Sequence, residues 1–154
     1  MSRLRLLACV LVGAVLLWAG PAQARASRGR TVGAEFGLGA DYLPDDDAGS
    51  FMGTVAVDTP IAQHLTMGGR FGLALESDPS RFAIPLDARL RFKLRRFYLD
   101  GLAGGWLFFK GEDHFRFHAG VGGGFLLSRT VRIGAELGYL DPSLMVGVRI
   151  AFAF

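Results

Sequence analysis

Two histidines and an arginine carry the most obvious chemistry in this sequence. His114, Arg116 and His118 are spaced two residues apart, so in an extended strand all three side chains project from one face. Two imidazoles on one face are suited to binding a divalent metal or to proton transfer. The arginine between them opposes a bound cation, because like charges repel. We expect no metal here, and the sequence assigns no role to either histidine.

A second candidate is the acidic run Asp45-Asp46-Asp47. Carboxylate oxygens are the ligands that calcium prefers, but this run lacks the alternating ligand spacing of a calcium-binding loop. A solvated acidic turn is the interpretation that we favour, and binding of a divalent cation stays open.

Hydrolytic, thiol and nucleic-acid chemistry have little support. No Gly-x-Ser-x-Gly string occurs, and Ser128 lies in an expected turn without an evident base. The only cysteine is Cys9, near the start of the chain. Basic and acidic side chains nearly balance once Arg3 and Arg5 are set aside, so no nucleic-acid footprint is present. We expect no catalytic residue, no cofactor and no nucleic-acid partner.

The segments that must position these residues alternate with a period of two, which is typical of strands. No window after residue 25 shows sustained helical spacing, and turn-forming stretches separate the apolar segments, so the sequence predicts an all-β, antiparallel, up-and-down fold. Pro85 is a misfit inside a strand, since it lacks an N–H, and predicts a bulge or a strand that begins at Leu86. The predicted strands are 32–42, 51–58, 64–75, 82–94, 97–109, 114–127, 131–139 and 144–154.

One face of each predicted strand is apolar, and the other carries glycine and ionisable residues. In 97–109 the face that holds Asp100 also holds Tyr98 and Trp106, and we place it inside with the other charges. Buried charges persist only when paired, so we interpret this set as a salt-bridge network that plugs a lumen. An alternative is a narrow anion-favouring path, because basic members outnumber acidic ones. The set is Glu35, Asp41, Arg70, Asp87, Arg89, Arg91, Lys93, Asp100, Arg116, Arg132, Glu136 and Arg149.

This inside-out pattern predicts an eight-stranded transmembrane β-barrel. Strands of this length cross the hydrocarbon layer when tilted, and lipid tolerates a sheet only when it closes on itself. A soluble barrel hides its large apolar side chains, whereas here the charges require the lumen. Gly120, Gly122 and Gly124 would make room there for long side chains, and aromatic residues near the strand ends favour an interfacial girdle.

The first 24 residues read as a cleaved secretory signal peptide, which leaves 25–154 as the barrel domain. Arg3 and Arg5 supply the charged region, Leu6 to Gly20 the apolar stretch, and Ala22-Gln23-Ala24 the cleavage site. A retained anchor is an alternative, although the apolar stretch is short for a spanning helix. The string that ends at Cys9 also resembles a lipobox, but the apolar run continues well beyond it.

The chain resembles the small OmpA-like and OmpX-like barrels along almost its whole mature length. Its ending, Gly147 to Phe154, is similar to the C-terminal signal of bacterial outer-membrane proteins. The resemblance implies a Gram-negative outer membrane, both termini in the periplasm, and outer loops at 43–50, 76–81, 110–113 and 140–143. It also implies periplasmic chaperones and an insertion machinery that reads Val148, Ile150, Phe152 and Phe154.

With such short loops we expect a monomer with a structural or surface-interaction role and no catalysis. Its partners would be the bilayer and lipopolysaccharide. If Asp45 to Asp47 bind divalent cations, these cations would link the loop to lipopolysaccharide. The alternatives are a narrow pore, which would conduct ions; a lipid-A-modifying enzyme, which would alter lipid A; and a soluble lipocalin-like carrier, which would need no detergent.

Overall fold

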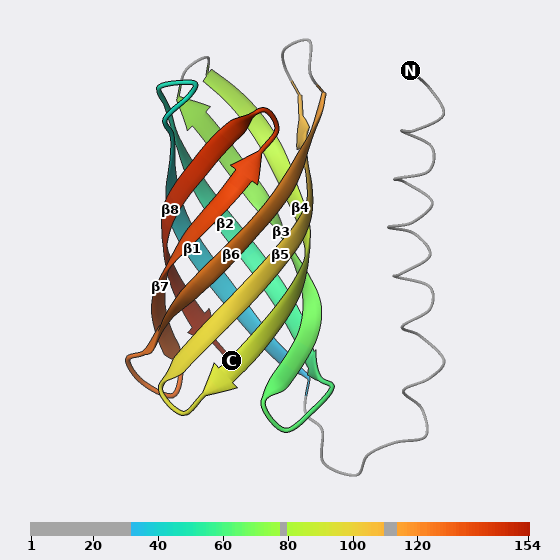
Figure 1. Ribbon diagram of the computed structural model, residues 1–154, viewed down its shortest axis with the longest axis vertical. Helices are drawn as coiled ribbons and strands as arrows, with labels where there is room; N and C mark the ends of the chain where they lie inside the picture. Colours follow the sequence, from blue (N-terminus) through green and yellow to red (C-terminus); the bar gives the residue numbers. More distant parts are fainter. Residues whose placement is uncertain (1–31, 78–79, 110–113) are drawn as a thin grey trace, which may run out of the picture. The chain divides into compact units, whose positions relative to one another are not determined.

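The protein is a closed antiparallel barrel of eight strands (Figure 1). The computed structural model describes residues 32–77, 80–109 and 114–154. Each strand pairs with its neighbours in the chain, and β1 pairs with β8 to close the sheet. The strands are β1 (Gly33–Leu43), β2 (Ala48–Pro60), β3 (Leu65–Ser77), β4 (Ser80–Leu94), β5 (Phe97–Phe108), β6 (Phe115–Leu126), β7 (Val131–Leu140) and β8 (Ser143–Ala153).

The predicted fold class is confirmed, because all eight strands and their antiparallel pairing are present. The start of β1 and the end of β8 lie at one rim, where Glu35 pairs with Ala153; we call this the terminal end. The other rim, with the connections β1–β2, β3–β4, β5–β6 and β7–β8, is the far end. Several strands run further than predicted, so the far-end connection expected over 43–50 shortens to 44–47.

Pro85 does not have the effect predicted for it. β4 runs unbroken from Ser80 to Leu94, and its register against β3 is the same on both sides of the proline, so there is no bulge. In the pairing of β3 with β4, only Gly72 and Leu73 of β3 lack a partner residue. The missing N–H faces β3, while the β5 side still aligns Pro85 with Trp106. A fifteen-residue strand tolerates this local gap because its remaining pairs hold the register.

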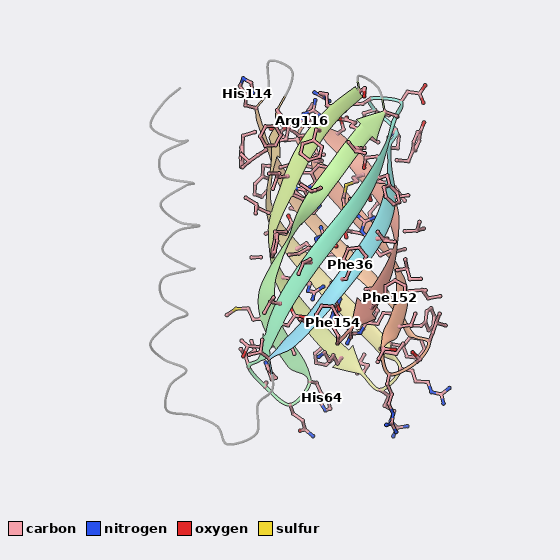
Figure 2. All side chains as sticks on the ribbon, turned by 180° about the vertical axis from the view of Figure 1, so that it is seen from behind. Phe36, His64, His114, Arg116, Phe152 and Phe154 are labelled. Atoms are coloured by element: carbon pink, nitrogen blue, oxygen red, sulfur yellow. The ribbon has the colours of Figure 1, made fainter. Side chains whose placement is uncertain are left out.

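The outer surface is apolar around the barrel and has aromatic side chains at both ends. Figure 2 shows Phe36, Phe152 and Phe154 on the outside, and His64 and His114 at opposite ends. The rings of Phe97 and Phe125 pair at 4.8 Å near the terminal end. Val121, in the middle of β6, is 63% exposed. A soluble protein would not leave so continuous an apolar surface in water.

The residues of the expected signal peptide lie outside the described part of the chain. Within the described part, no helix is long and apolar enough to cross a membrane.

We predict that Val121→Arg weakens the barrel in lipid by about 2–4 kcal/mol, because it places a charge near the middle of the hydrocarbon layer. Val32→Arg is the matched control, since Val32 precedes β1 at the terminal end and an interfacial arginine costs about 0–1 kcal/mol. Urea unfolding from lipid vesicles, followed by tryptophan fluorescence, measures both. Equal costs for the two variants would contradict the assignment of the outer face to lipid.

Candidate functional site

The part of the lumen nearer the terminal end is organised around one carboxylate. Glu35 of β1 is 5% exposed and accepts hydrogen bonds from Arg89 and Arg91 of β4 and from Arg132 of β7. The Arg91 Nη1–Glu35 Oε2 distance is 2.7 Å. Three guanidinium groups from two strands across the barrel therefore converge on one side chain of β1.

Two of these arginines also bind a second carboxylate. Arg89 also binds Asp58 of β2, with Nε 3.1 Å from Oδ1. Arg91 also binds Asp100 of β5 through two hydrogen bonds, at 2.7 and 2.6 Å. The Tyr98 ring lies 4.5 Å from the Arg91 guanidinium carbon. We call Glu35, Asp58, Arg89, Arg91, Asp100 and Arg132 the Glu35 cluster.

A second group of charges lies further toward the far end and is built around Arg70 of β3. This guanidinium binds Asp87 of β4 at 2.7 Å and Glu136 of β7 at 2.6 Å. His118 is fully buried, with Nδ1 2.7 Å from Asp87 Oδ1 and Nε2 3.5 Å from Glu136 Oε1. We call these residues, together with Asp41 and Arg149, the Arg70 cluster.

Arg149 links the Arg70 cluster to the closing strand. Its guanidinium lies 2.6 Å from Asp41 of β1 and 3.2 Å from Glu136. A Cβ atom on Gly39 would lie 2.8 Å from the Arg149 side chain, which would have to shift, so this glycine leaves Arg149 its present position. A Cβ atom on Gly124 would overlap the Ile133 carbonyl oxygen of β7 and lie 2.7 Å from the Tyr98 hydroxyl. Gly124 thus allows the close approach of the β7 backbone as well as giving room to Tyr98.

An apolar layer fills the lumen between the Arg70 cluster and the far end. Trp106 is 1% exposed and stacks on Phe108 at 6.3 Å. Such contiguous side chains exclude water as a protein core does. The layer consists of Leu43, Met52, Ala74, Ala83, Trp106, Phe108, Leu140 and Met145.

The acidic run lies at the far-end rim, where protein donors occupy its carboxylates. Asp46 accepts hydrogen bonds from the Ser143 hydroxyl at 2.7 Å and from Arg116 at 3.3 Å. The Ser143 hydrogen bond, aided by Arg116, holds the pKa of Asp46 below its usual value. Asp45 accepts from the Leu144 N–H, and Asp47 from the Tyr42 hydroxyl. The run therefore ties the first turn to neighbouring strands, and the described residues hold no cluster able to bind a metal.

The predicted charges divide among these groups. The structure brings Glu35, Arg89, Arg91, Asp100 and Arg132 together in one cluster and Asp41, Arg70, Asp87, Glu136 and Arg149 in the other. Arg116 pairs with Asp46 at the far end. Lys93 is exposed at the terminal end and has no ion-pair partner among the described residues.

The sequence missed some ionisable residues of the lumen. Asp58 lies at the end of the predicted segment 51–58, on the face opposite Val57, but is not in the predicted inward set; β2 continues past it to Pro60. Glu76 and Arg81 pair at 2.9 Å, whereas the sequence places them in a loop. Alternation applied to the last residue of 51–58 would have found Asp58, and alternation extended by one residue beyond 64–75 and 82–94 would have found Glu76 and Arg81.

His118 and His114 do not form a joint site. His114 Nδ1 lies 3.3 Å from the Phe108 carbonyl oxygen at the far end, whereas His118 is enclosed by Asp87, Glu136 and Trp106. Among the described residues, no hydroxyl group makes a hydrogen bond to His118. A buried His–carboxylate pair without a nucleophile supports charge pairing rather than general-base catalysis.

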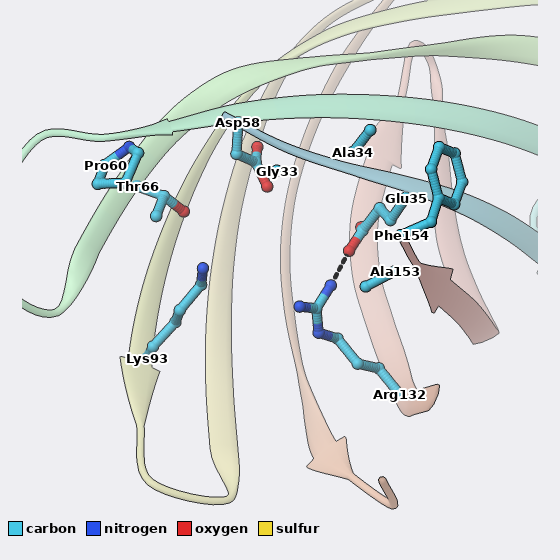
Figure 3. A pocket seen from close by; sticks show the side chains of 10 residues that line it. All are labelled: Gly33, Ala34, Glu35, Asp58, Pro60, Thr66, Lys93, Arg132, Ala153 and Phe154. Carbon is cyan, nitrogen blue, oxygen red and sulfur yellow. Dashed lines mark hydrogen bonds and ion pairs between the residues drawn. The ribbon is translucent and has the colours of Figure 1, made fainter. Parts of the chain in front are cut away.

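Two small cavities flank the Glu35 cluster. One, of about 100 Å³, lies toward the terminal end and is lined by Glu35, Asp58 and Lys93 among others (Figure 3). The other, of about 40 Å³, is lined by Glu35, Arg70 and Tyr98 among others. Glu35 lines both cavities.

Comparisons with known proteins identify the fold. No family model matches the sequence, and no curated protein matches it. A de novo designed transmembrane β-barrel superposes with a TM-score of 0.64 at 14% identity, covering 84% of this chain and 98% of the design. The outer membrane protein Ail of Yersinia pestis, in a bilayer nanodisc, superposes with a TM-score of 0.54 at 13% identity, covering 80% and 100%. The chain therefore has the fold of small eight-stranded transmembrane barrels.

We predict that Glu35→Gln destabilises the barrel by about 3–5 kcal/mol, because it leaves buried guanidinium charges without their shared carboxylate. The control is Asp47→Asn, the same loss of charge at an exposed turn, which should change stability by less than about 0.5 kcal/mol. The free energy of unfolding in vesicles reports both. A cost for Glu35→Gln no larger than that of the control would show that Glu35 does not hold the lumen together.

Proposed function

We propose that this protein is a monomeric barrel of a Gram-negative outer membrane with a structural or surface-interaction role. The observation that carries the proposal is the division of the barrel into an apolar exterior and a lumen closed by paired charges and an apolar layer. The exterior suits the bilayer. The closed interior gives no continuous passage and holds no assembled catalytic group among the described residues.

The outer membrane is the favoured location for two reasons. The fold is shared with a protein described as an outer membrane protein, at a TM-score of 0.54. The last strand also presents Val148, Ile150 and Phe152 in alternation on the outer surface, followed by Phe154, as the C-terminal signal of such proteins does. These features support recognition by periplasmic chaperones and the insertion machinery.

A structural or contact role is favoured over a pore, an enzyme or a carrier. Ions would have to cross the Glu35 cluster, the Arg70 cluster and the apolar layer in turn, past paired charges and apolar side chains that leave small cavities of about 100 and 40 Å³ beside them. The far-end connections are short: four residues join β1 to β2, and two join β7 to β8. So little loop surface favours contact with the lipids around the barrel, lipopolysaccharide included, over a large lid or receptor platform.

Membrane fractionation with a gel-shift assay tests the proposal. The full chain is expressed in a Gram-negative host, and its outer membranes are run on SDS gels with and without boiling. We expect a band in the outer-membrane fraction that shifts on boiling, no discrete conductance in planar bilayers, and unchanged lipid A. Val121→Pro is the control for an unclosed sheet, because it removes a ladder donor from mid-strand β6 and should abolish the shift.

Each alternative predicts a different result. Regular conductance steps would indicate a pore, altered lipid A an enzyme, and a protein that is soluble without detergent a carrier. Any one of these would replace the proposed role.

The proposed terminal signal is tested by Phe154→Ser. Phe154 is 80% exposed, and among the described residues its one hydrogen bond is from its backbone N–H to the Ala34 carbonyl oxygen, so refolding of the purified variant in detergent should be unchanged. In cells we expect severalfold less heat-modifiable protein in the outer membrane. Val32→Ser, at the same rim, serves as the control for loss of an exposed apolar side chain. A normal amount of the Phe154 variant in the membrane would remove Phe154 from the signal.

A further inference from the structure

The larger of the two cavities, at the terminal end, is lined by polar groups from several strands. Figure 3 shows Thr66 and Lys93 on one side of it and Glu35 and Arg132 on the other, with Asp58 between them. Its volume of about 100 Å³ has room for one tetrahedral oxyanion or for about three water molecules. The chemistry of its lining decides which of these it favours.

The charge balance around the cavity leaves one cation over. In the Glu35 cluster, the guanidinium groups of Arg89, Arg91 and Arg132 pair with the carboxylates of Glu35, Asp58 and Asp100. Lys93 lines the same cavity and makes no ion pair with any described residue. The carboxylates of Glu35 and Asp58 that face the cavity are thus held by arginines, and Lys93 is the lining cation that keeps no ion pair within the described part of the chain.

A buried hydroxyl in the lining also lacks a partner. Thr66 of β3 is 4% exposed, and its Oγ1 forms no hydrogen bond with any residue that the structure describes. Leaving a buried hydroxyl unpaired is unfavourable, and most such groups in proteins have a partner. Thr66 and Lys93 lie on the same side of the cavity, so one acceptor can bind the hydroxyl and the ammonium together.

We propose that this cavity is a binding site for a single small oxyanion of the phosphate class. Lys93 supplies the charge, Thr66 donates a hydrogen bond, and Arg132, which keeps Glu35 as its partner, adds positive potential from the opposite side. The exposed position of Lys93 allows entry from the terminal end. The phosphate group has two possible sources, a free ion or a phospholipid headgroup at that rim. The site does not depend on the structural role proposed above.

Titration of the full chain, purified from membranes in a neutral detergent, tests the proposal. Inorganic phosphate is added at constant ionic strength against chloride, and the backbone amide resonances of Thr66 and Lys93 are followed by NMR. We expect saturable shifts at these positions. Lys93→Gln should weaken binding about tenfold, as loss of a charge-assisted hydrogen bond does, and Thr66→Val should weaken it severalfold.

Arg129→Gln is the matched control, because it removes one exposed positive charge from the β6–β7 turn at the same end, outside the cavity. It should leave the affinity within about twofold. Heat-modifiability confirms that each variant is folded. Absence of saturable shifts in the unchanged protein, or equal weakening by Lys93→Gln and Arg129→Gln, would overturn the site and leave a water-filled cavity.

The source of the phosphate is resolved by a second arm in nanodiscs. Shifts of the same amides that appear on replacing zwitterionic lipid with phosphatidylglycerol, and that Lys93→Gln abolishes, identify a headgroup ligand. Shifts with inorganic phosphate alone identify a free ion. Both results support the site, and no response in either arm refutes it.

Discussion

The narrow interior of an eight-stranded barrel imposes the constraint on which the rest of this structure depends. Side chains fill such a lumen, so a charge that points inward cannot rely on water for its solvation. Here arginine meets that constraint, because its planar group binds two carboxylates at once. Arg89, Arg91 and Arg70 each bridge two acidic partners.

Much of the fold was predictable because the side-chain period of a strand is two, and the two environments of a membrane barrel differ sharply. Alternation alone placed Glu35, Asp87 and Glu136 inside and most aromatic residues outside, with Tyr98 and Trp106 among those inside. Their partners were not predictable. Glu35 meets arginines 54 and 56 positions away, and that contact depends on the tilt and register of four strands. Strand ends were also misplaced, because turn-forming residues at 59–60 and 76–77 still pair in the ladder.

The lumen contains two chemically different kinds of layer, one of paired charges and one of apolar side chains. In the charged layers a passing ion would have to compete with fixed ion pairs, whereas in the layer around Trp106 it would lose its hydration with nothing to replace it. Neither layer alone spans the barrel. Basic residues outnumber acidic ones in the predicted lumen set, but nearly every one of these cations is paired with a carboxylate. The excess of basic residues in the sequence is therefore not enough to indicate an anion path.

The ion pairs of the lumen also link strands that are distant in the chain. Arg132 of β7 reaches Glu35 of β1, and Arg149 of β8 reaches Asp41 of β1, so these pairs exist only when the last strands lie beside the first. An open sheet of the first six strands would lack Glu136 and Arg149, so Arg70 and Asp41 would each lose an ion-pair partner. A partly assembled barrel would therefore leave charged side chains without their ion-pair partners. The barrel should form in one cooperative transition, with edge closure and charge neutralisation as a single event.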